Sequence, residues 1–154
     1  MGNRGFEYIA NMVVLRNCPL FSSLSPGELR RLTGAVRQFR CEAHDVLLKE
    51  GDSNTTLYLL SSGEVELTSA EGVQRRISAQ EKGTTCFFGE IDLFLPGNRV
   101  DYTVIALAPT EILTLGRTDL YALMSENPSI PIRIVEMFST RLAEYERRRR
   151  DTVL

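Results

Sequence analysis

The feature that most restricts the fold of this chain is a run of short β segments between residues 46 and 115. Residues 64–67 alternate polar and apolar side chains with period two, which is the pattern of a half-buried strand. Turn signals containing glycine, serine or proline separate the segments, and this arrangement favours a sandwich or barrel over a βαβ fold. The expected strands are residues 46–48, 57–60, 64–67, 73–77, 102–107 and 112–115.

Two helical segments are expected before the β region. Residues 6–15 carry apolar side chains at helical spacing. Further along, Ser25 is followed by Pro26 and then by Glu28, three residues after the serine. This is the pattern of a capping box with proline in the first turn, and it predicts that a helix begins at Pro26.

Two more helices are expected after the β region. Thr118 or Asp119 can cap a short helix that ends before Pro128, and a longer helix follows over residues 129–150. The longer helix carries an apolar stripe, which must either cover its own domain or pair with a second copy. The stripe consists of Ile134, Val135, Phe138, Leu142 and Tyr145.

Length, charge and hydropathy narrow the class of protein. The 154 residues suit one domain, and 43% hydrophobic residues are enough for one core. A formal net charge of −2 gives no reason to expect nucleic-acid binding. No apolar stretch approaches the ~18 residues that a membrane span needs, and the first residues do not have the pattern of a signal peptide.

The cysteine and histidine counts exclude several kinds of site. Cys18, Cys41 and Cys86 are odd in number and far apart, so neither a disulfide framework nor a zinc site is expected. Free cysteines favour a reducing compartment, and we therefore expect a cytoplasmic protein. His44 is the single histidine, and it cannot supply a metal-ligand set or a base next to a nucleophile motif. We expect no enzyme, no catalytic residue and no metal.

The most informative motif is Phe87-Phe88-Gly89-Glu90-Ile91, followed nine residues after the glutamate by Arg99. A glycine lets the backbone approach a ligand and expose its amides. The carboxylate of Glu90 can accept from hydroxyls, and Arg99 can bind a phosphate. A short helical turn over residues 91–95 would bring both ends to one pocket, which suits a small ligand with a hydroxyl at one end and an anion at the other.

With these motifs the chain resembles the cyclic nucleotide-binding domain family, the module of catabolite-activator-type regulators, cyclic-nucleotide-dependent protein kinases and gated channels. The resemblance implies a mainly β fold with flanking α-helices: an eight-stranded β-roll, or double-stranded β-helix of jelly-roll type, with N-terminal helices and a C-terminal helix. It covers about residues 15–142 and rests on Cys18-Pro19-Leu20-Phe21, Glu50-Gly51-Asp52, residues 57–60, Gly63-Glu64-Val65, Gly83, Phe88-Gly89-Glu90-Ile91, Asp119-Leu120 and Asn127-Pro128.

The resemblance also implies a ligand, cAMP or cGMP, with no other cofactor. Glu90 would bind the ribose 2′-hydroxyl, and Arg99 would pair with the cyclic phosphate. Counting back from Thr103 places the phosphate position at Val100 instead. The implied binding residues are Phe88, Gly89, Glu90, Ile91, Arg99 and Val100.

The implied function is a non-enzymatic regulatory sensor that signals through its C-terminal helix, such as the effector domain of a transcription regulator. The expected parts are an N-terminal helical segment at 1–24, the nucleotide-binding-like domain at 15–142, and a lid or dimerisation helix at 129–154. We expect no DNA-reading element in this chain. The alternative is a degenerate domain that binds no nucleotide and serves protein interaction or dimerisation. Val100 and Asp101 favour this alternative, because a carboxylate next to an anion is repelled.

Overall fold

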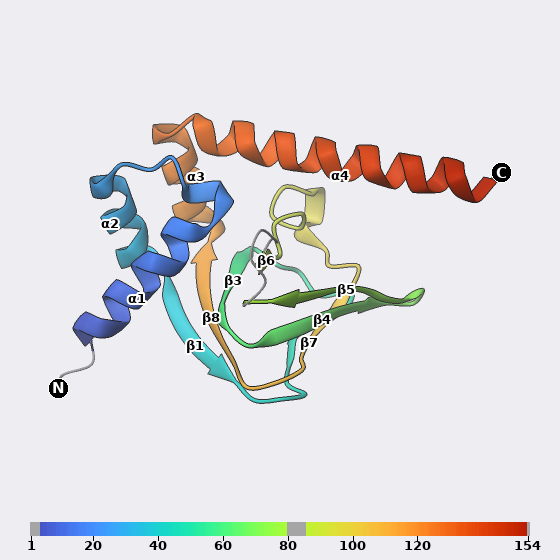
Figure 1. The fold of residues 1–154 in the computed structure, drawn as a ribbon, viewed down its shortest axis with the longest axis horizontal. Coiled ribbons are helices and arrows are strands. Elements are labelled where there is room, and N and C mark those ends of the chain that lie inside the picture. The colour runs from blue at the N-terminus through green and yellow to red at the C-terminus, as the bar shows by residue number, and fades with distance from the viewer. Residues whose placement is uncertain (1–3, 80–85, 154) are drawn as a thin grey trace.

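The computed structural model describes residues 4–79 and 86–153, and it shows a β-roll with helices on one side (Figure 1). Two four-stranded antiparallel sheets have the strand orders β1-β8-β3-β6 and β2-β7-β4-β5. This confirms the mainly β fold expected from the sequence. The strands are β1 Arg37–Cys41, β2 Val46–Leu48, β3 Thr56–Ser62, β4 Glu64–Ser69, β5 Gly72–Ser78, β6 Phe87–Phe88, β7 Thr103–Ala106 and β8 Thr110–Gly116.

Two of these strands, β1 and β6, are not among the strands expected from the sequence. In β1 only Cys41 is buried, so the strand shows no alternation that a sequence pattern could reveal. Strand β6 is only two residues long and pairs with β3 through Tyr58 and Phe88. Gly83, which carries part of the family resemblance, lies outside the described residues.

Alternation in β3 divides the hydrophobic core into two clusters. Leu57 and Leu59 point to the cluster beneath the helices, whereas Leu60 points into the interior of the roll. The interior cluster includes Val65 of β4 and Phe88 of β6. The first sheet therefore has one face against the helices and the other against the second sheet.

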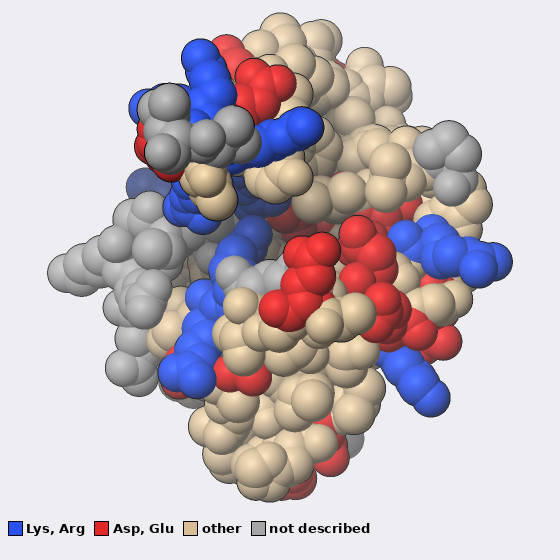
Figure 2. Space-filling view, turned by 90° about the vertical axis from the view of Figure 1, so that its right-hand side faces the viewer, with Lys and Arg blue, Asp and Glu red and all other residues tan. Residues whose placement is uncertain are grey.

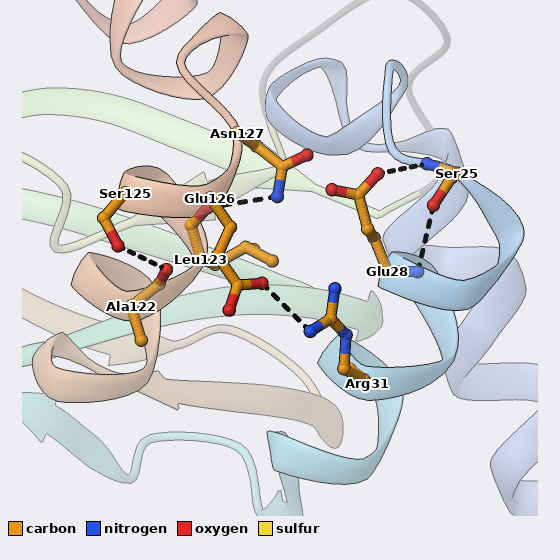
Figure 3. A network of polar contacts seen from close by, with 8 residues as sticks. All are labelled: Ser25, Glu28, Arg31, Ala122, Leu123, Ser125, Glu126 and Asn127. Carbon is orange, nitrogen blue, oxygen red and sulfur yellow. Dashed lines mark hydrogen bonds and ion pairs between the residues drawn. The ribbon is translucent and has the colours of Figure 1, made fainter.

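Helix α1 (Arg4–Asn17) and helix α2 (Pro26–Ala35) confirm the two expected N-terminal helices. The predicted capping box is present: the Glu28 amide donates to Ser25 Oγ at 3.2 Å, and the Ser25 amide donates to Glu28 Oε1 at 2.8 Å (Figure 3). Between these helices, η1 (Pro19–Phe21) is a short 3-10 turn with a buried Leu20 and Phe21.

Helix α3 (Arg117–Glu126) ends before Asn127-Pro128, as the sequence predicts. The prediction that Thr118 or Asp119 caps this helix is wrong. The N-cap residue is Gly116, which has no side chain that could accept a hydrogen bond. The amide of Arg117 instead donates to the Thr55 carbonyl at 2.9 Å. An ion pair of 3.0 Å between Arg31 and Glu126 joins α3 to α2 (Figure 3).

Helix α4 (Ser129–Val153) is 25 residues long and runs past the β-roll, with its C-terminal end beyond the strands (Figure 1). The stripe expected on one side of it divides in two. Ile134 is buried and Phe138 is half-buried against the domain, whereas Val135 and Leu142 are exposed. Within residues 4–79 and 86–153, no helix has both the length and the apolar character needed to cross a bilayer.

Candidate functional site

A pocket of about 400 Å³ lies between the β-roll and α4. Four of the predicted binding residues line it: Phe88, Gly89, Glu90 and Ile91. Figure 2 faces the side on which α4 ends, and there both basic and acidic side chains border the hollow below the helix end. The other lining residues are Leu67, Arg75, Asp101, Tyr102, Arg141 and Tyr145.

Gly89 sets the path of the backbone at the pocket. Its φ of 86° lies in the left-handed region that favours glycine. A Cβ added to Gly89 would lie 2.7 Å from the Thr56 carbonyl oxygen and 2.9 Å from Asn54 Nδ2. Any other residue would therefore push this turn away from β3, and the position of Glu90 would change with it.

Glu90 is buried, and its carboxylate forms an ion pair with the guanidinium of Arg141 from α4. A buried carboxylate without a partner would be costly, so this contact stabilises the charge of Glu90. Arg141 follows Ile134 and Phe138 on the inner side of the helix, at a spacing of seven and then three residues. The pair therefore ties the middle of α4 to the binding motif.

A buried polar network lies behind the Gly89 turn. The Tyr102 hydroxyl donates to Asp92 Oδ2 at 2.7 Å, and Asn54 Nδ2 donates to the same oxygen at 3.3 Å. Burial raises the pKa of Asp92, while these two hydrogen bonds oppose the shift. This network is not predicted from the sequence, although Asp92 directly follows the Phe87–Ile91 motif and Tyr102 belongs to a predicted strand.

Arg99 and Val100 do not line this pocket. Arg99 is exposed and bridges through its backbone to Ser53. Its side chain borders a separate depression formed with Glu50, Leu95 and Asp101 among others. Val100 contributes to that depression as well, but it is buried in the interior core cluster.

The separation of Arg99 from Glu90 has a local cause. Residues 91–95 form turns rather than the expected helical turn, and η2 (Pro96–Asn98) follows with Gly97 at a φ of 81°. These turns place Arg99 beside the loop before β3. The expectation that Glu90 and Arg99 face each other across one cavity is therefore wrong for this structure, while their roles toward a ligand stay predictions.

Arg75 and Arg141 are the two basic residues of the pocket, and neither is predicted from the sequence. Arg75 is half-buried in β5, and its Nη2 donates to the Phe87 carbonyl at 3.2 Å. The period-two pattern of β5 contains a signal for it, because Arg75 and the buried Ile77 share one face of the strand. For Arg141 the signal is the helical spacing from Phe138.

Comparison with known proteins decides the family. Residues 38–127 match the cyclic nucleotide-binding domain, which is more than half of the chain. This chain belongs to the cyclic nucleotide-binding domain family. The family is regulatory in its kinase and transcription members, and its fold agrees with the β-roll described above.

The relatives of this cyclic nucleotide-binding domain include a channel protein, kinase regulatory subunits and a cyclic AMP receptor protein of Thermus thermophilus, which is 29% identical over 84% of this chain and 60% of its own length. A putative potassium channel protein of Rhodopseudomonas palustris is 32% identical over 88% of this chain and 32% of its own length. A cAMP-dependent protein kinase regulatory subunit of Emericella nidulans is 34% identical over 67% of this chain and 24% of its own length. The chain thus spans a third or less of these two curated relatives.

Solved structures agree with this assignment. The catabolite activator protein of Thermus thermophilus superposes with a TM-score of 0.70 at 26% identity, covering 83% of this chain and 60% of that one. The sensor domain of a transcriptional regulator from Pseudomonas aeruginosa superposes with a TM-score of 0.76 at 19% identity, covering 91% and 93%. The second likeness supports the fold of the domain alone.

Proposed function

We propose that this domain is a non-catalytic sensor that binds cAMP or cGMP in the pocket between the Gly89 turn and α4. The observation that carries the proposal is the buried carboxylate of Glu90, held at the pocket by a turn that only glycine fits. Relatives named as cAMP-dependent kinase regulatory subunits and as a cyclic AMP receptor protein support the choice of ligand.

The pocket offers a partner for each part of such a ligand. Glu90 would accept a hydrogen bond from a ribose hydroxyl, and the amides around Gly89 would face the sugar-phosphate ring. Leu67 and Phe88 provide apolar walls. Tyr145 at the pocket is exposed, and its ring is available to stack on a base.

The contact between Glu90 and Arg141 suggests how binding would reach α4. A ribose hydroxyl that bonds to Glu90 would share the carboxylate with Arg141, and the pair would have to rearrange. A ligand moves a helix only by its differential affinity for the two arrangements. We propose that α4 is the output element for this reason.

Calorimetric titration with cAMP and with cGMP tests the proposal. We expect binding to the wild type, and a loss of affinity of about tenfold or more in Glu90→Gln, because a hydrogen bond to a charged group contributes about 1.5–3 kcal/mol. Glu66→Gln is the matched control, since Glu66 lies on β4 and pairs with the exposed Arg76. A folded wild type that binds neither nucleotide would overturn the proposal.

A second candidate function is an interaction module that binds no nucleotide and pairs with another copy through α4. Exposed Val135 and Leu142, one helical repeat of seven residues apart, favour it. Sedimentation of the wild type beside Leu142→Glu tests this candidate. A dimer that dissociates in the variant supports pairing, and a monomeric wild type at high concentration excludes it.

The family also supports a proposal about the kind of protein that contains the domain and the compartment in which it acts. We propose that the domain is the effector part of a regulator that acts in the cytoplasm, and that its nucleotide-binding unit spans about residues 15–142. Cys18, Cys41 and Cys86 are all free, which suits a reducing compartment. Measuring the thiol count of protein purified without reductant tests the compartment, because disulfide-linked cysteines would contradict it.

A further inference from the structure

We propose that Arg75, and not Arg99, receives the anionic group of the ligand in this pocket; the inference rests on the proposed function and assigns its phosphate position. The spacing of the sequence motif predicts Arg99 for this role, because that residue follows Glu90 at the expected distance along the chain. The geometry points to an arginine from a different strand, whose place in the pocket is set by the pairing of β5 with β4.

The first support is position. Arg75 lines the same pocket as Gly89 and Glu90, with its side chain on the inward face of β5. Its Nη2 donates to the carbonyl of Phe87, two residues before Gly89, so its guanidinium lies beside the strand that leads into the binding turn. Arg99 lies in the separate depression and is exposed.

The second support is that Arg75 has few partners for its hydrogen-bond donors. In the part of the chain that the structure describes, Arg141 pairs with Glu90 and Arg76 pairs with Glu66, whereas Arg75 has no carboxylate within ion-pair distance. A guanidinium has five N–H donors, and the described hydrogen bonds of Arg75 use one carbonyl acceptor. Donors therefore remain for two oxygens of a phosphate.

The third support is the cost of burying Arg75. Burial lowers its pKa, and the nearby charge of Glu90 opposes that effect. Arginine stays protonated in proteins, so the cation remains in the pocket with its desolvation only partly compensated. An anion placed against Arg75 would provide the missing compensation.

The depression beside Arg99 is a poorer place for an anion. Glu50 and Asp101 line it together with Arg99, so an anion there would meet two carboxylates and one guanidinium. Asp101 and Glu90 also line the pocket of Arg75, but there two guanidiniums, those of Arg75 and Arg141, face the two carboxylates. The balance of nearby charges favours the pocket of Arg75.

Titration of cAMP and cGMP into four proteins tests the assignment: wild type, Arg75→Gln, Arg99→Gln and Arg76→Gln. Arg76 is the matched control, because it is the next residue on β5 and points to the other face. We expect Arg75→Gln to lose about thirtyfold or more in affinity, and the other two variants to stay within about twofold. Loss of binding in Arg99→Gln with retention in Arg75→Gln would overturn the inference and leave the proposed function standing.

Failure of the proposed function itself is recognised separately. If the folded wild type binds neither nucleotide, titration of the wild type with inorganic phosphate, followed through the arginine Nε–H resonances, still tests Arg75. A saturable shift of the Arg75 resonance, with Arg99 unchanged, supports the anion site. Absence of that shift, or a saturable shift at Arg99, contradicts it, and this readout needs no substitution that could unfold the domain.

Discussion

The stretch from Gly89 to Arg99, which lies between β6 and β7, has two halves in opposite environments, residues 89–94 and residues 95–99. In the first half Glu90, Asp92 and Leu93 are buried, and their side chains take part in the pocket, the polar network and the core. In the second half Leu95 and Arg99 are exposed. The motif is continuous in the sequence, yet only its first half is defined by side-chain packing.

The second half is held through the side chain of Asn98, which bonds to Arg117 and to the Asp92 carbonyl, and through its backbone. The Asn54 amide donates to the Asn98 carbonyl at 2.7 Å, and the Val100 amide donates to the Asp52 carbonyl at 2.8 Å. Backbone bonds of this kind fix the course of the chain without specifying the side chains. The comparison teaches that a residue's place in a motif does not determine whether its side chain reaches the ligand pocket.

The sharpest way to break this comparison is to replace a glycine in each half. Gly89→Ala should lower the free energy of unfolding by about 3 kcal/mol, because left-handed strain adds to a close contact with Thr56. Gly97→Ala should cost only about 1 kcal/mol, since its φ of 81° brings strain but its Cβ would meet nothing within 4 Å. Urea unfolding measures both, and equal losses would contradict the contrast.

A smaller effect is expected from Tyr102→Phe, which removes the 2.7 Å hydrogen bond to Asp92 in the first half. The Asp92 carboxylate would keep the hydrogen bond from Asn54 but would lose the one that the Tyr102 hydroxyl donates to it. We expect a loss of about 2 kcal/mol in the free energy of unfolding. Phe39→Leu, at an exposed position of β1, is a control for general loss of aromatic surface. An unchanged stability in Tyr102→Phe would show that the network does not hold this half.

The raised pKa of Asp92 predicts a pH dependence. The pKa of Asp92 is 3.8 in the unfolded chain and higher in the fold. At pH values between these two pKa values, the folded protein binds more protons than the unfolded chain does. The contribution of Asp92 to stability is therefore fully present below the unfolded pKa and is lost as the pH rises through the folded pKa. Asn at this position does not titrate.

Urea unfolding of the wild type and Asp92→Asn at about pH 5 and about pH 7 measures this dependence. The stability of the wild type relative to the variant should be greater at the lower pH. The other carboxyls are common to both proteins and largely cancel in the comparison. A difference that grows toward neutral pH would show that the hydrogen bonds from Tyr102 and Asn54 outweigh the burial of Asp92.

The smallest effect is expected in the exposed part of the second half. Arg99 makes no side-chain hydrogen bond or ion pair with the residues that the structure describes. Arg99→Ala should therefore change the free energy of unfolding by no more than about 0.5 kcal/mol. A loss of more than 1 kcal/mol, an amount typical of about one net hydrogen bond, would mean that Arg99 supports the fold after all.

How much of this could be predicted from the sequence depends on how local each feature is. The capping box at Ser25 was predictable because its partner lies three residues away. The period-two strands and the pocket residues around Gly89 were predictable for the same reason. Strand β1 was not, because pairing with β8 rather than its own pattern makes it a strand.

The candidate site was only half predictable. The place of Arg99 depends on turns whose geometry the spacing to Glu90 does not contain. Arg75 and Arg141 reach the pocket from a strand and a helix distant from the motif along the chain, so only the folded arrangement brings them together. Periodicity indicates which way each side chain points, but not which residues it meets.

The length of α4 has a mechanical consequence. At 1.5 Å per residue, its 25 residues extend about 37 Å, and the contact of Arg141 with Glu90 lies near its middle. If the helix pivots at its N-terminal end, a tilt of about 10° displaces its far end by about 6 Å, about twice the displacement of Arg141 near its middle. If α4 is the output element proposed above, it would act as a lever that turns a rearrangement of one carboxylate into a larger displacement at the end of the helix.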